Sequence, residues 1–441
     1  MHAAGDKKLE VPKDLGDGLI LRQATQADVE KLVAFNVDVF SESEGEETGR
    51  KIGVWTRDLM TGSHPTTGAS DFTLVEDTAT GKIVSSLCLI SQTWSYGGIE
   101  FGVVRMEIIG THPKYRKRGL VRAQMDVVHA FSAARGQCVQ VIAGIPWFYR
   151  MFGYEMALAL GGGRTGYPVL IPELEDGKEE PYNIRTATRG LERNLVACNR
   201  DEKDDEKAWE YELAGKSADS VETCKVCILE RSNGEAVGYF LHPATLWKQA
   251  IFVLSFDLAS GLSWMDVMPT VVRYLRTTGE EYEKQPGSEP FGAYSFWMGG
   301  DHPLYHAYPD LLPRKREPYA YYIRVPDLAR FLIRIRPILE ERLAQSAFVG
   351  HSGGLQLNFY REGWALVFED GALKAVELWQ VGAEDGDALF PGLTFLQLLF
   401  GYRSLDELDF AFPDCYPLTN AGRALLSALF PKQTSHVWPL G

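Results

Sequence analysis

The stretch HPKYRKRGLVR, residues 112–122, gathers basic side chains around Gly119 in a chain whose formal net charge is −14. The apolar run FGVVRMEIIGT precedes it, and a helical pattern follows it over residues 120–135. The first N–H groups of a helix have no partner within the helix, so a strand–glycine turn–helix order offers them to an anion. A glycine removes the Cβ that would block the approach, and lysine and arginine add charge-assisted hydrogen bonds. The pattern therefore suits a pyrophosphate.

Two other interpretations of this basic stretch stay open on the residues alone. It is also typical of a solvated surface, or of a patch that binds nucleic acid. The acidic balance of the whole chain argues against nucleic acid as the main partner and is compatible with a cationic substrate.

The pattern around this stretch predicts an α/β layer of mixed α+β type. Residues 19–22 are typical of a strand, Thr25 suits the N-cap of a helix, and two strands meet at a turn around Gly81. Another strand starts at Val139. Further along the chain, a second block repeats this order without the basic turn, and a third block starts near Pro318.

Length and composition indicate an ordinary globular protein of about three domains. Of its 441 residues, 45% are hydrophobic and 24% are charged. No run of about 18 apolar residues predicts a membrane span, and the polar N-terminus lacks the apolar core of a signal peptide. We therefore expect a cytoplasmic protein. The six cysteines include one CxxC pair, Cys224 and Cys227, without a second pair nearby, so no metal site is predicted.

Two motifs resemble the GCN5-related N-acetyltransferases (GNAT). The run THPKYRKRGLVRAQM, residues 111–125, is similar to motif A, the Arg/Gln-x-x-Gly-x-Gly/Ala loop that binds the pyrophosphate of acetyl-CoA. Val121 stands where that motif has glycine or alanine, and the enhanced intracellular survival (Eis) branch carries bulky residues there. The segment GIPWFYRMFGYE, residues 144–155, resembles the Y-x-x-F-G-Y segment of the same branch.

The resemblance implies a three-domain plan. Residues 1–158 are expected to form a GNAT domain with the acetyl-CoA site, and residues 159–312 a second, degenerate GNAT-like domain. Residues 313–441 are expected to form an α+β domain similar to sterol carrier proteins.

The resemblance also implies which residues bind acetyl-CoA, used as a co-substrate without a metal ion. Main-chain groups at the end of the fourth strand are expected to pair with the pantetheine arm, the basic turn to hold the pyrophosphate, and two residues after the fifth strand to touch the cofactor. These residues are Ile109, Gly110 and Thr111; Lys117, Arg118, Gly119, Leu120, Val121 and Arg122; and Gly144 and Ile145.

Catalytic roles follow from the same resemblance. Tyr149 matches the general acid, and a phenol with a reference pKa near 10 is able to protonate or hydrogen-bond a leaving thiolate. Packing in an aromatic core is the other interpretation of Tyr149. The general base in the Eis branch is the C-terminal carboxylate, here that of Gly441. Glu107 and His436 are alternatives.

The implied function is acetyl transfer from acetyl-CoA to a primary amine of a small cationic acceptor, similar to an aminoglycoside or a polyamine. The alternatives are a non-catalytic protein that binds coenzyme A or a lipid, and a protein-lysine acetyltransferase. The partners expected are a small-molecule amine and further copies of this chain in a homo-oligomer, with neither nucleic acid nor membrane.

Overall fold

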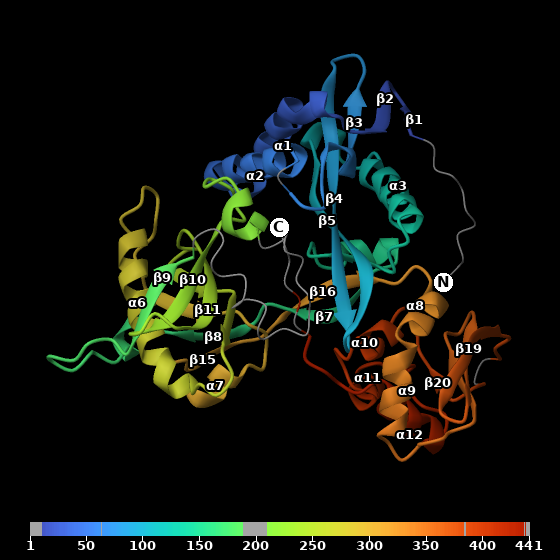
Figure 1. Cartoon of the computed structure of the whole chain (residues 1–441). Helices are drawn as coiled ribbons and strands as arrows, with labels where there is room; N and C mark the ends of the chain where they lie inside the picture. The colour runs from blue at the N-terminus through green and yellow to red at the C-terminus, as the bar shows by residue number, and fades with distance from the viewer. Residues whose placement is uncertain (1–10, 63, 188–209, 383–384, 436, 438–441) are drawn as a thin grey trace. The chain divides into compact units, whose positions relative to one another are not determined.

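The computed structural model describes residues 11–62, 64–187, 210–382, 385–435 and 437. Helices and strands alternate through it, so the predicted mixed α/β class is confirmed (Figure 1). Contacts divide the chain into two compact units, which are described separately below. Unit 1 is Met1–Phe35, Ala69–Leu158 and Ala320–Ser435, and unit 2 is Asn36–Gly68, Ala159–Tyr319 and His436–Gly441.

An eight-stranded sheet organises unit 1, in the order β1-β2-β3-β4-β5-β6-β16-β7. Strands β5 and β6 are parallel, whereas β16 pairs with β6 antiparallel. Strand β16 comes from the segment that was predicted to belong to a third domain. The strands are β1 Lys13–Gly16, β2 Leu19–Gln23, β3 Phe72–Asp77, β4 Lys82–Tyr96, β5 Ile99–Thr111, β6 Val139–Ile142, β7 Glu155–Leu160 and β16 Tyr319–Arg324.

Helix α3 (Leu120–Ala134) packs on this sheet through its apolar face. Val127 joins Leu21 and Val75 in one buried cluster, and Met125 joins Met106 in another. The predicted helix is confirmed, and Gly136, with φ +70°, follows its C-terminus. Helix α1 (Val29–Glu44) follows the short η1 (Gln26–Asp28), at whose start the Asp28 carboxylate accepts a 2.8 Å hydrogen bond from the Thr25 N–H.

The C-terminal part of unit 1 has its own sheet, in the order β19-β18-β17-β20. The hairpin between β18 and β19 turns at Asp370 and Gly371, which both have positive φ angles, +51° and +80°. The elements are α8 Leu328–Arg334, α9 Arg336–Ala344, β17 Gly353–Asn358, β18 Gly363–Glu369, β19 Ala372–Trp379, β20 Ala388–Leu389, α10 Phe395–Leu399, α11 Leu405–Ala411 and α12 Asn420–Leu429.

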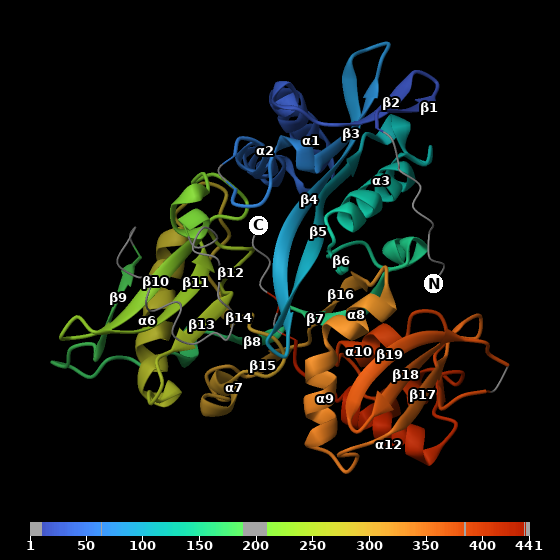
Figure 2. The same ribbon diagram turned by 45° about the vertical axis from the view of Figure 1, so that its right-hand side comes forward.

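Polar contacts join this C-terminal part to the eight-stranded sheet. The Tyr96 hydroxyl donates to the carbonyl of Leu399 at 2.7 Å and accepts from Arg342 at 2.9 Å. The Gln397 amide donates to the Glu155 carboxylate at 3.2 Å. Figure 2 shows α8–α10 beside the ends of β4 and β5. The two parts of unit 1 are therefore held together by specific hydrogen bonds.

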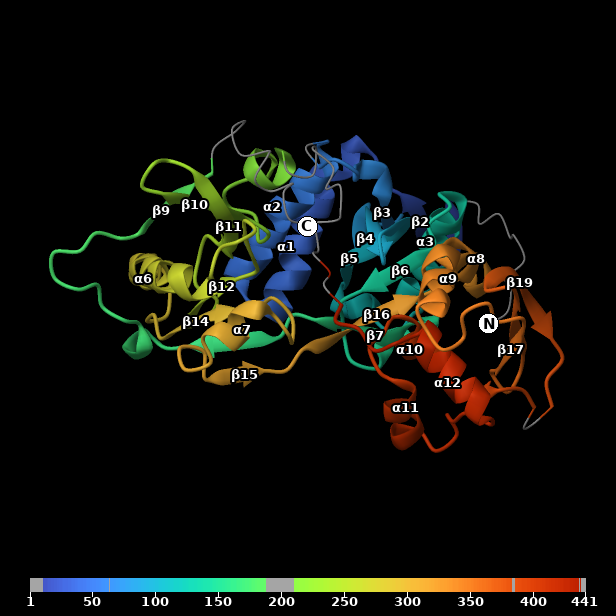
Figure 3. The ribbon, with the colours of Figure 1, turned by 60° about the horizontal axis from the view of Figure 1, so that its bottom comes forward.

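Unit 2 contains two four-stranded sheets, β13-β11-β10-β9 and β12-β14-β8-β15, with helix α6 (Trp264–Tyr282) packed on them (Figure 3). Val267, Val271 and Leu275 of α6 are fully buried. The remaining elements are α2 Glu46–Met60, β8 Gly163–Gly166, β9 Tyr182–Thr186, β10 Cys224–Arg231, β11 Ala236–Pro243, β12 Ala250–Val253, β13 Ser255–Leu258, β14 Ala293–Phe296, α7 Pro303–Ala307 and β15 Arg314–Arg316. Among the described helices of both units, none is long and apolar enough to cross a membrane.

Candidate active site

Strands β5 and β6 separate at their carboxyl ends. They pair in parallel from Val103 with Val139 to Arg105 with Val141. Strand β6 then ends at Ile142, whereas β5 continues to Thr111. The side of β5 that faces away from β4 therefore has no strand partner beyond Arg105 in the described chain. A strand edge without a neighbouring strand is a place where amides of a ligand can pair, although the Thr111 carbonyl already accepts a 3.2 Å hydrogen bond from Nε of Arg116.

A β-bulge lies in the part of β5 beyond Arg105, where β5 pairs with β4 but not with β6. Ser86 pairs with Gly110 and Cys88 with Glu107, so Ile108 and Ile109 together face one residue of β4. Ile108 has φ +51° and is buried, and Ile109 is half-buried. Gly110 is buried, and its carbonyl accepts a 2.9 Å hydrogen bond from the Ser85 hydroxyl. The bulge reorients the strand where the sequence predicts contact with a pantetheine arm.

Gly119 leaves the start of α3 open. It is the N-cap residue, with φ +76° and ψ +11°, a left-handed conformation that suits glycine. A Cβ built on it would meet no atom within 4 Å. The first N–H groups of α3 have no partner within the helix, and Gly119 has no side chain to cap them. The predicted anion site at this turn is therefore not packed shut.

The basic side chains around this turn are exposed, and two of them, Arg118 and Arg122, contact other side chains. Arg118 forms a 2.7 Å ion pair with Asp17 and lies over the ring of Tyr115. Arg122 lies over the ring of Phe152, 5.1 Å from its centroid. Leu120 is buried and Val121 half-buried, so these two contribute main-chain groups rather than charge. The glycine turn and its cations fit a pyrophosphate.

The start of α6 in unit 2 is closed by comparison. The Ser263 hydroxyl caps it by accepting from the N–H of Met265 at 3.1 Å. Asp266 places a carboxylate in its first turn, and Trp264 packs edge-on against Phe256. A side-chain cap and a negative charge both disfavour an anion here. Of these two helix starts, the one at Gly119 therefore suits an anion better.

Tyr149 lies on the short helix η4 (Phe148–Phe152), in an aromatic cluster of unit 1. Its side chain is 5% exposed, and its ring lies 5.7 Å from that of Tyr322 and 5.1 Å from that of Phe148. The Tyr149 hydroxyl has no hydrogen-bond partner among the described residues. Burial, with a smaller effect of the Glu107 charge, raises the pKa of Tyr149 above its usual value of 10. The phenol therefore stays protonated at neutral pH, as a hydrogen-bond donor must.

Two of the predicted site residues flank this tyrosine. Gly144 makes room for it, because a Cβ on Gly144 would come within 2.2 Å of the Tyr149 ring. Ile145 is 64% exposed. The neighbouring Trp147 is 70% exposed, and its N–H donates to the Tyr322 hydroxyl at 2.7 Å. The turn therefore presents exposed apolar side chains while its backbone is fixed from inside.

The three candidates for the general base differ in what the structure says of them. Glu107 forms a 2.6 Å ion pair with Arg105, and both side chains are largely buried. Because side chains alternate along a strand, both point to the face opposite Met106. His436 and Gly441 lie outside the described residues.

Two residues near Tyr149, Tyr322 and Tyr154, were not among the site residues predicted from the sequence. Tyr322 comes from β16, far along the chain, and no local signal marks it. Tyr154 lies inside the recognised segment, and its hydroxyl lies 2.8 Å from Nε2 of His129 on α3. Burial lowers the pKa of His129 to about 3, so this imidazole is neutral.

No group of three or more histidine, cysteine, aspartate or glutamate side chains in the described ranges is arranged to hold a metal ion. Cys227 of the CxxC pair is buried in unit 2, with its sulfur 3.5 Å from Nε2 of His242. Burial raises the pKa of this thiol to about 11, which disfavours the thiolate that a metal would need.

Comparisons with known proteins agree with this geometry. Residues 21–157 match the family model described as "Acetyltransferase (GNAT) domain". A search of curated proteins gives no match.

Solved structures resemble nearly the whole chain at low sequence identity. A probable N-acyltransferase of unknown function from Enterococcus faecalis V583 has a TM-score of 0.61 and 14% identity, over 92% of this chain and 96% of that one. A GCN5-related N-acetyltransferase from Anabaena variabilis ATCC 29413 has a TM-score of 0.59 and 14% identity, over 96% of this chain and 99% of that one. Eis1 from Mycobacterium abscessus has a TM-score of 0.54 and 13% identity, over 95% of this chain and 98% of that one. These likenesses show the fold, and the match to the GNAT acetyltransferase model covers residues 21–157.

Proposed function

We propose that this protein is an acetyl-CoA-dependent N-acetyltransferase of the Eis-like branch, which acetylates a primary amine of a small cationic acceptor. The observation that carries the proposal is the open start of α3 at Gly119, together with the bulged end of β5, which pairs with β4 but not with β6. GNAT domains take their acyl group from an acyl-CoA, and these two features would hold its diphosphate and its pantetheine arm. Aminoglycoside-like and polyamine-like acceptors both suit the acidic chain, whose net charge is −14.

The residues divide the binding work between backbone and side chains. Main-chain N–H groups at the first turn of α3 would donate hydrogen bonds to the diphosphate oxygens, with Lys117, Arg118 and Arg122 adding positive charge. Ile109, Gly110 and Thr111 would pair with the pantetheine amides along the free side of β5. Gly144 and Ile145 would border the acyl end.

Tyr149 would act at the sulfur of the thioester. As the acceptor nitrogen bonds to the carbonyl carbon, the carbon–sulfur bond breaks and the sulfur keeps its electron pair. The Tyr149 hydroxyl would donate a hydrogen bond to that sulfur, which the raised pKa of the phenol allows at neutral pH.

The acceptor nitrogen must also lose a proton to a base. We propose the C-terminal carboxylate of Gly441 for this role, as the resemblance implies. Glu107 is second, because its ion pair with Arg105 stabilises the charged carboxylate but also occupies one of its oxygens.

An amine panel tests the proposal. Purified protein is mixed with acetyl-CoA and an aminoglycoside, a polyamine, a lysine peptide or no amine, and free thiol and product mass are followed. Thiol release with acetylated product is expected for a small polycationic amine. Tight acetyl-CoA binding without turnover on any amine would instead support the non-catalytic alternative, and acetylation of the peptide alone would support the protein-lysine alternative.

A matched pair of glycine variants ties activity to the α3 turn. Gly119 and Gly234 have similar positive φ angles, +76° and +82°, and both face open space. A glutamate at either position brings the same backbone strain, but only Gly119→Glu places a negative charge at the proposed diphosphate site. We expect Gly119→Glu to abolish the rise in melting temperature caused by acetyl-CoA and Gly234→Glu to retain it. Loss in both variants, or in neither, would contradict the assigned site.

Oligomeric state is a separate proposal. We propose a homo-oligomer in the cytoplasm, and light scattering of the purified protein at micromolar concentration would test its assembly.

A further inference from the structure

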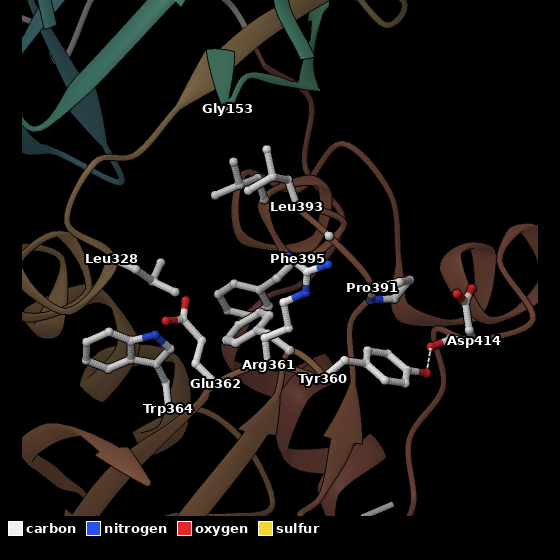
Figure 4. A pocket seen from close by; sticks show the side chains of 13 residues that line it. Gly153, Leu328, Tyr360, Arg361, Glu362, Trp364, Pro391, Leu393, Phe395 and Asp414 are labelled. Atoms are coloured by element: carbon white, nitrogen blue, oxygen red, sulfur yellow. Dashed lines mark hydrogen bonds between the residues drawn. The ribbon is translucent and has the colours of Figure 1, made fainter. Parts of the chain in front are cut away.

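A cavity lies in the C-terminal part of unit 1, and the proposed acetyl transfer does not use it. Its volume is about 600 Å³, within the range of small-molecule sites. Most of its wall is apolar: Leu328, Phe359, Trp364, Leu393 and Phe395 (Figure 4). Gly153, at the end of η4, is its one lining residue from the GNAT domain.

Arg361 supplies the cavity's positive charge. Figure 4 shows its side chain rising between Phe395 and Leu393, in the middle of the lining residues. The Arg361 guanidinium forms no ion pair and no side-chain hydrogen bond within the part of the chain that the structure describes. Two carboxylates also line the cavity, with Glu362 beside Trp364 and Asp414 beyond the ring of Tyr360. The central polar group of the cavity is therefore a guanidinium without an anion.

We propose that this cavity binds an apolar monocarboxylate. The guanidinium fork of Arg361 would hold the carboxylate in a bidentate pair. The aromatic rings of Phe359, Trp364 and Phe395 would cover the apolar body. An aromatic ring and a medium-length alkyl chain both meet these requirements, so the shared chemistry is a single carboxylate on an apolar body.

Two contacts connect the cavity to the helix that carries Tyr149. Gly153, with φ +84°, ends η4, and its N–H donates to the Arg150 carbonyl at 3.1 Å. Phe395 and Leu396, which also line the cavity, belong to α10, and the next residue of α10, Gln397, donates to Glu155.

Glu155 carries the second contact onward to η4. The same carboxylate oxygen of Glu155 accepts a 2.6 Å hydrogen bond from Arg150, the residue after Tyr149. A ligand in the cavity therefore touches both ends of a short hydrogen-bonded path to η4. Its binding is expected to order residues 148–155.

The first experiment measures binding. The whole protein is titrated calorimetrically with 2-naphthaleneacetate and with decanoate, and in parallel with the corresponding amines and alcohols. The acids are expected to bind at least about tenfold more tightly than the alcohols, because a charged hydrogen-bonded pair is lost with an alcohol. A preference for naphthaleneacetate or for decanoate identifies ring or chain as the natural body. Amines that bind as tightly as the acids would overturn the proposal.

Variants place the ligand in the cavity. Arg361→Gln is expected to weaken acid binding about tenfold, and Arg361→Lys to weaken it less because the charge remains. Arg336→Gln is the control, since Arg336 is a partly exposed arginine on α9 that does not line the cavity. Equal affinities in Arg361→Gln and Arg336→Gln would remove the ligand from this cavity, and Arg361→Lys covers the case in which the glutamine variant does not fold.

The second experiment measures the coupling without using catalysis. Hydrogen exchange of peptides covering residues 148–155 is followed with and without saturating acid. Slower exchange in wild-type protein, absent in Arg361→Gln, is the expected result. Unchanged exchange with a fully occupied cavity would overturn the coupling. Because neither readout requires turnover, this inference survives or fails separately from the proposed function.

Discussion

The main-chain N–H of Trp147 donates a 2.7 Å hydrogen bond to the hydroxyl of Tyr322, and this bond connects the turn before Tyr149 to strand β16. Strand β16 enters the eight-stranded sheet between β6 and β7, although most of unit 2 lies between β7 and β16 in the sequence. The Tyr322 ring also packs 5.7 Å from that of Tyr149. A strand from the later part of the chain thus positions the proposed acid.

Tyr322→Phe is expected to keep the ring contact and lose the hydrogen bond to Trp147. The loss of one such bond costs about 1 kcal/mol of unfolding free energy. We expect kcat to fall several-fold while the affinity for acetyl-CoA stays within about twofold, because η4 loosens and the α3 turn does not. Steady-state kinetics and calorimetry measure both quantities.

Tyr239→Phe is the control for this variant, since it also removes a tyrosine hydrogen bond, the one to Asp257 in unit 2. Its stability is expected to fall without a change in kcat. Equal kcat values for Tyr322→Phe and wild type would show that Tyr322 has no role in positioning Tyr149.

Tyr149→Phe tests the proposed acid directly. General acid catalysis contributes about 10²–10⁴-fold to a rate, so we expect kcat to fall at least about a hundredfold with little change in acetyl-CoA affinity. Because burial raises the pKa of Tyr149, the phenol should stay protonated up to about pH 10. The pH profile of wild-type kcat should therefore show no decline below that pH caused by ionisation of Tyr149, so wild type and Tyr149→Phe should have the same profile shape there. A mutant that turns over at the wild-type rate would remove Tyr149 from the mechanism.

Asp17→Asn tests whether the ion pair with Arg118 competes with the diphosphate. Asp17 is highly exposed, so its 2.7 Å pair contributes little to stability, about 0–1 kcal/mol. Its removal frees the Arg118 guanidinium, and we expect acetyl-CoA to bind about two- to threefold more tightly at low salt. The gain should shrink in high salt, where charges are screened. Asp176→Asn, on an exposed connection, controls for net charge, and weaker binding of acetyl-CoA to Asp17→Asn would contradict the idea.

Gly144→Ala tests the space in front of Tyr149. Its Cβ would approach the ring to 2.2 Å, so the ring or the backbone must move. Such overpacking costs about 1–3 kcal/mol, and we expect a lower melting temperature together with a lower kcat. Gly68→Ala is the control, because a Cβ there meets nothing within 4 Å and its φ is not positive. A normal kcat in Gly144→Ala would separate Gly144 from catalysis.

Local chemistry in the sequence predicts part of this site, and long-range pairing decides the rest. The αL glycine at Gly119, the helix after it and the Asp370-Gly371 turn all follow from the few residues around them. The bulge does not, because its place at Ile108 and Ile109 depends on how β5 registers with β4. The contact of Tyr322 with Tyr149 depends on β16 joining a sheet whose other strands come earlier, and no local pattern encodes that pairing.

The half-buried His129 should make unit 1 less stable in acid. His129 has a pKa of about 3 in the folded protein and about 6.5 when unfolded. Between these values the unfolded chain binds a proton that the folded chain excludes, so stability is lost as the pH falls below about 6.5. The slope for one such group is about 1.4 kcal/mol per pH unit. Urea unfolding at pH 7, 6 and 5, followed by hydrogen exchange of α3 peptides, should show this loss.

His129→Gln should flatten that dependence for α3 while lowering stability at pH 7, since glutamine has no proton to gain. His242, buried in unit 2 with a pKa of about 4, provides the control. His242→Gln is expected to flatten the dependence for α6 peptides and leave that of α3 unchanged. Equal stability of α3 at pH 5 and pH 7 in wild-type protein would contradict this prediction. It would mean that His129 takes up a proton in the folded state and that the imidazole next to the Tyr154 hydroxyl is charged at pH 5.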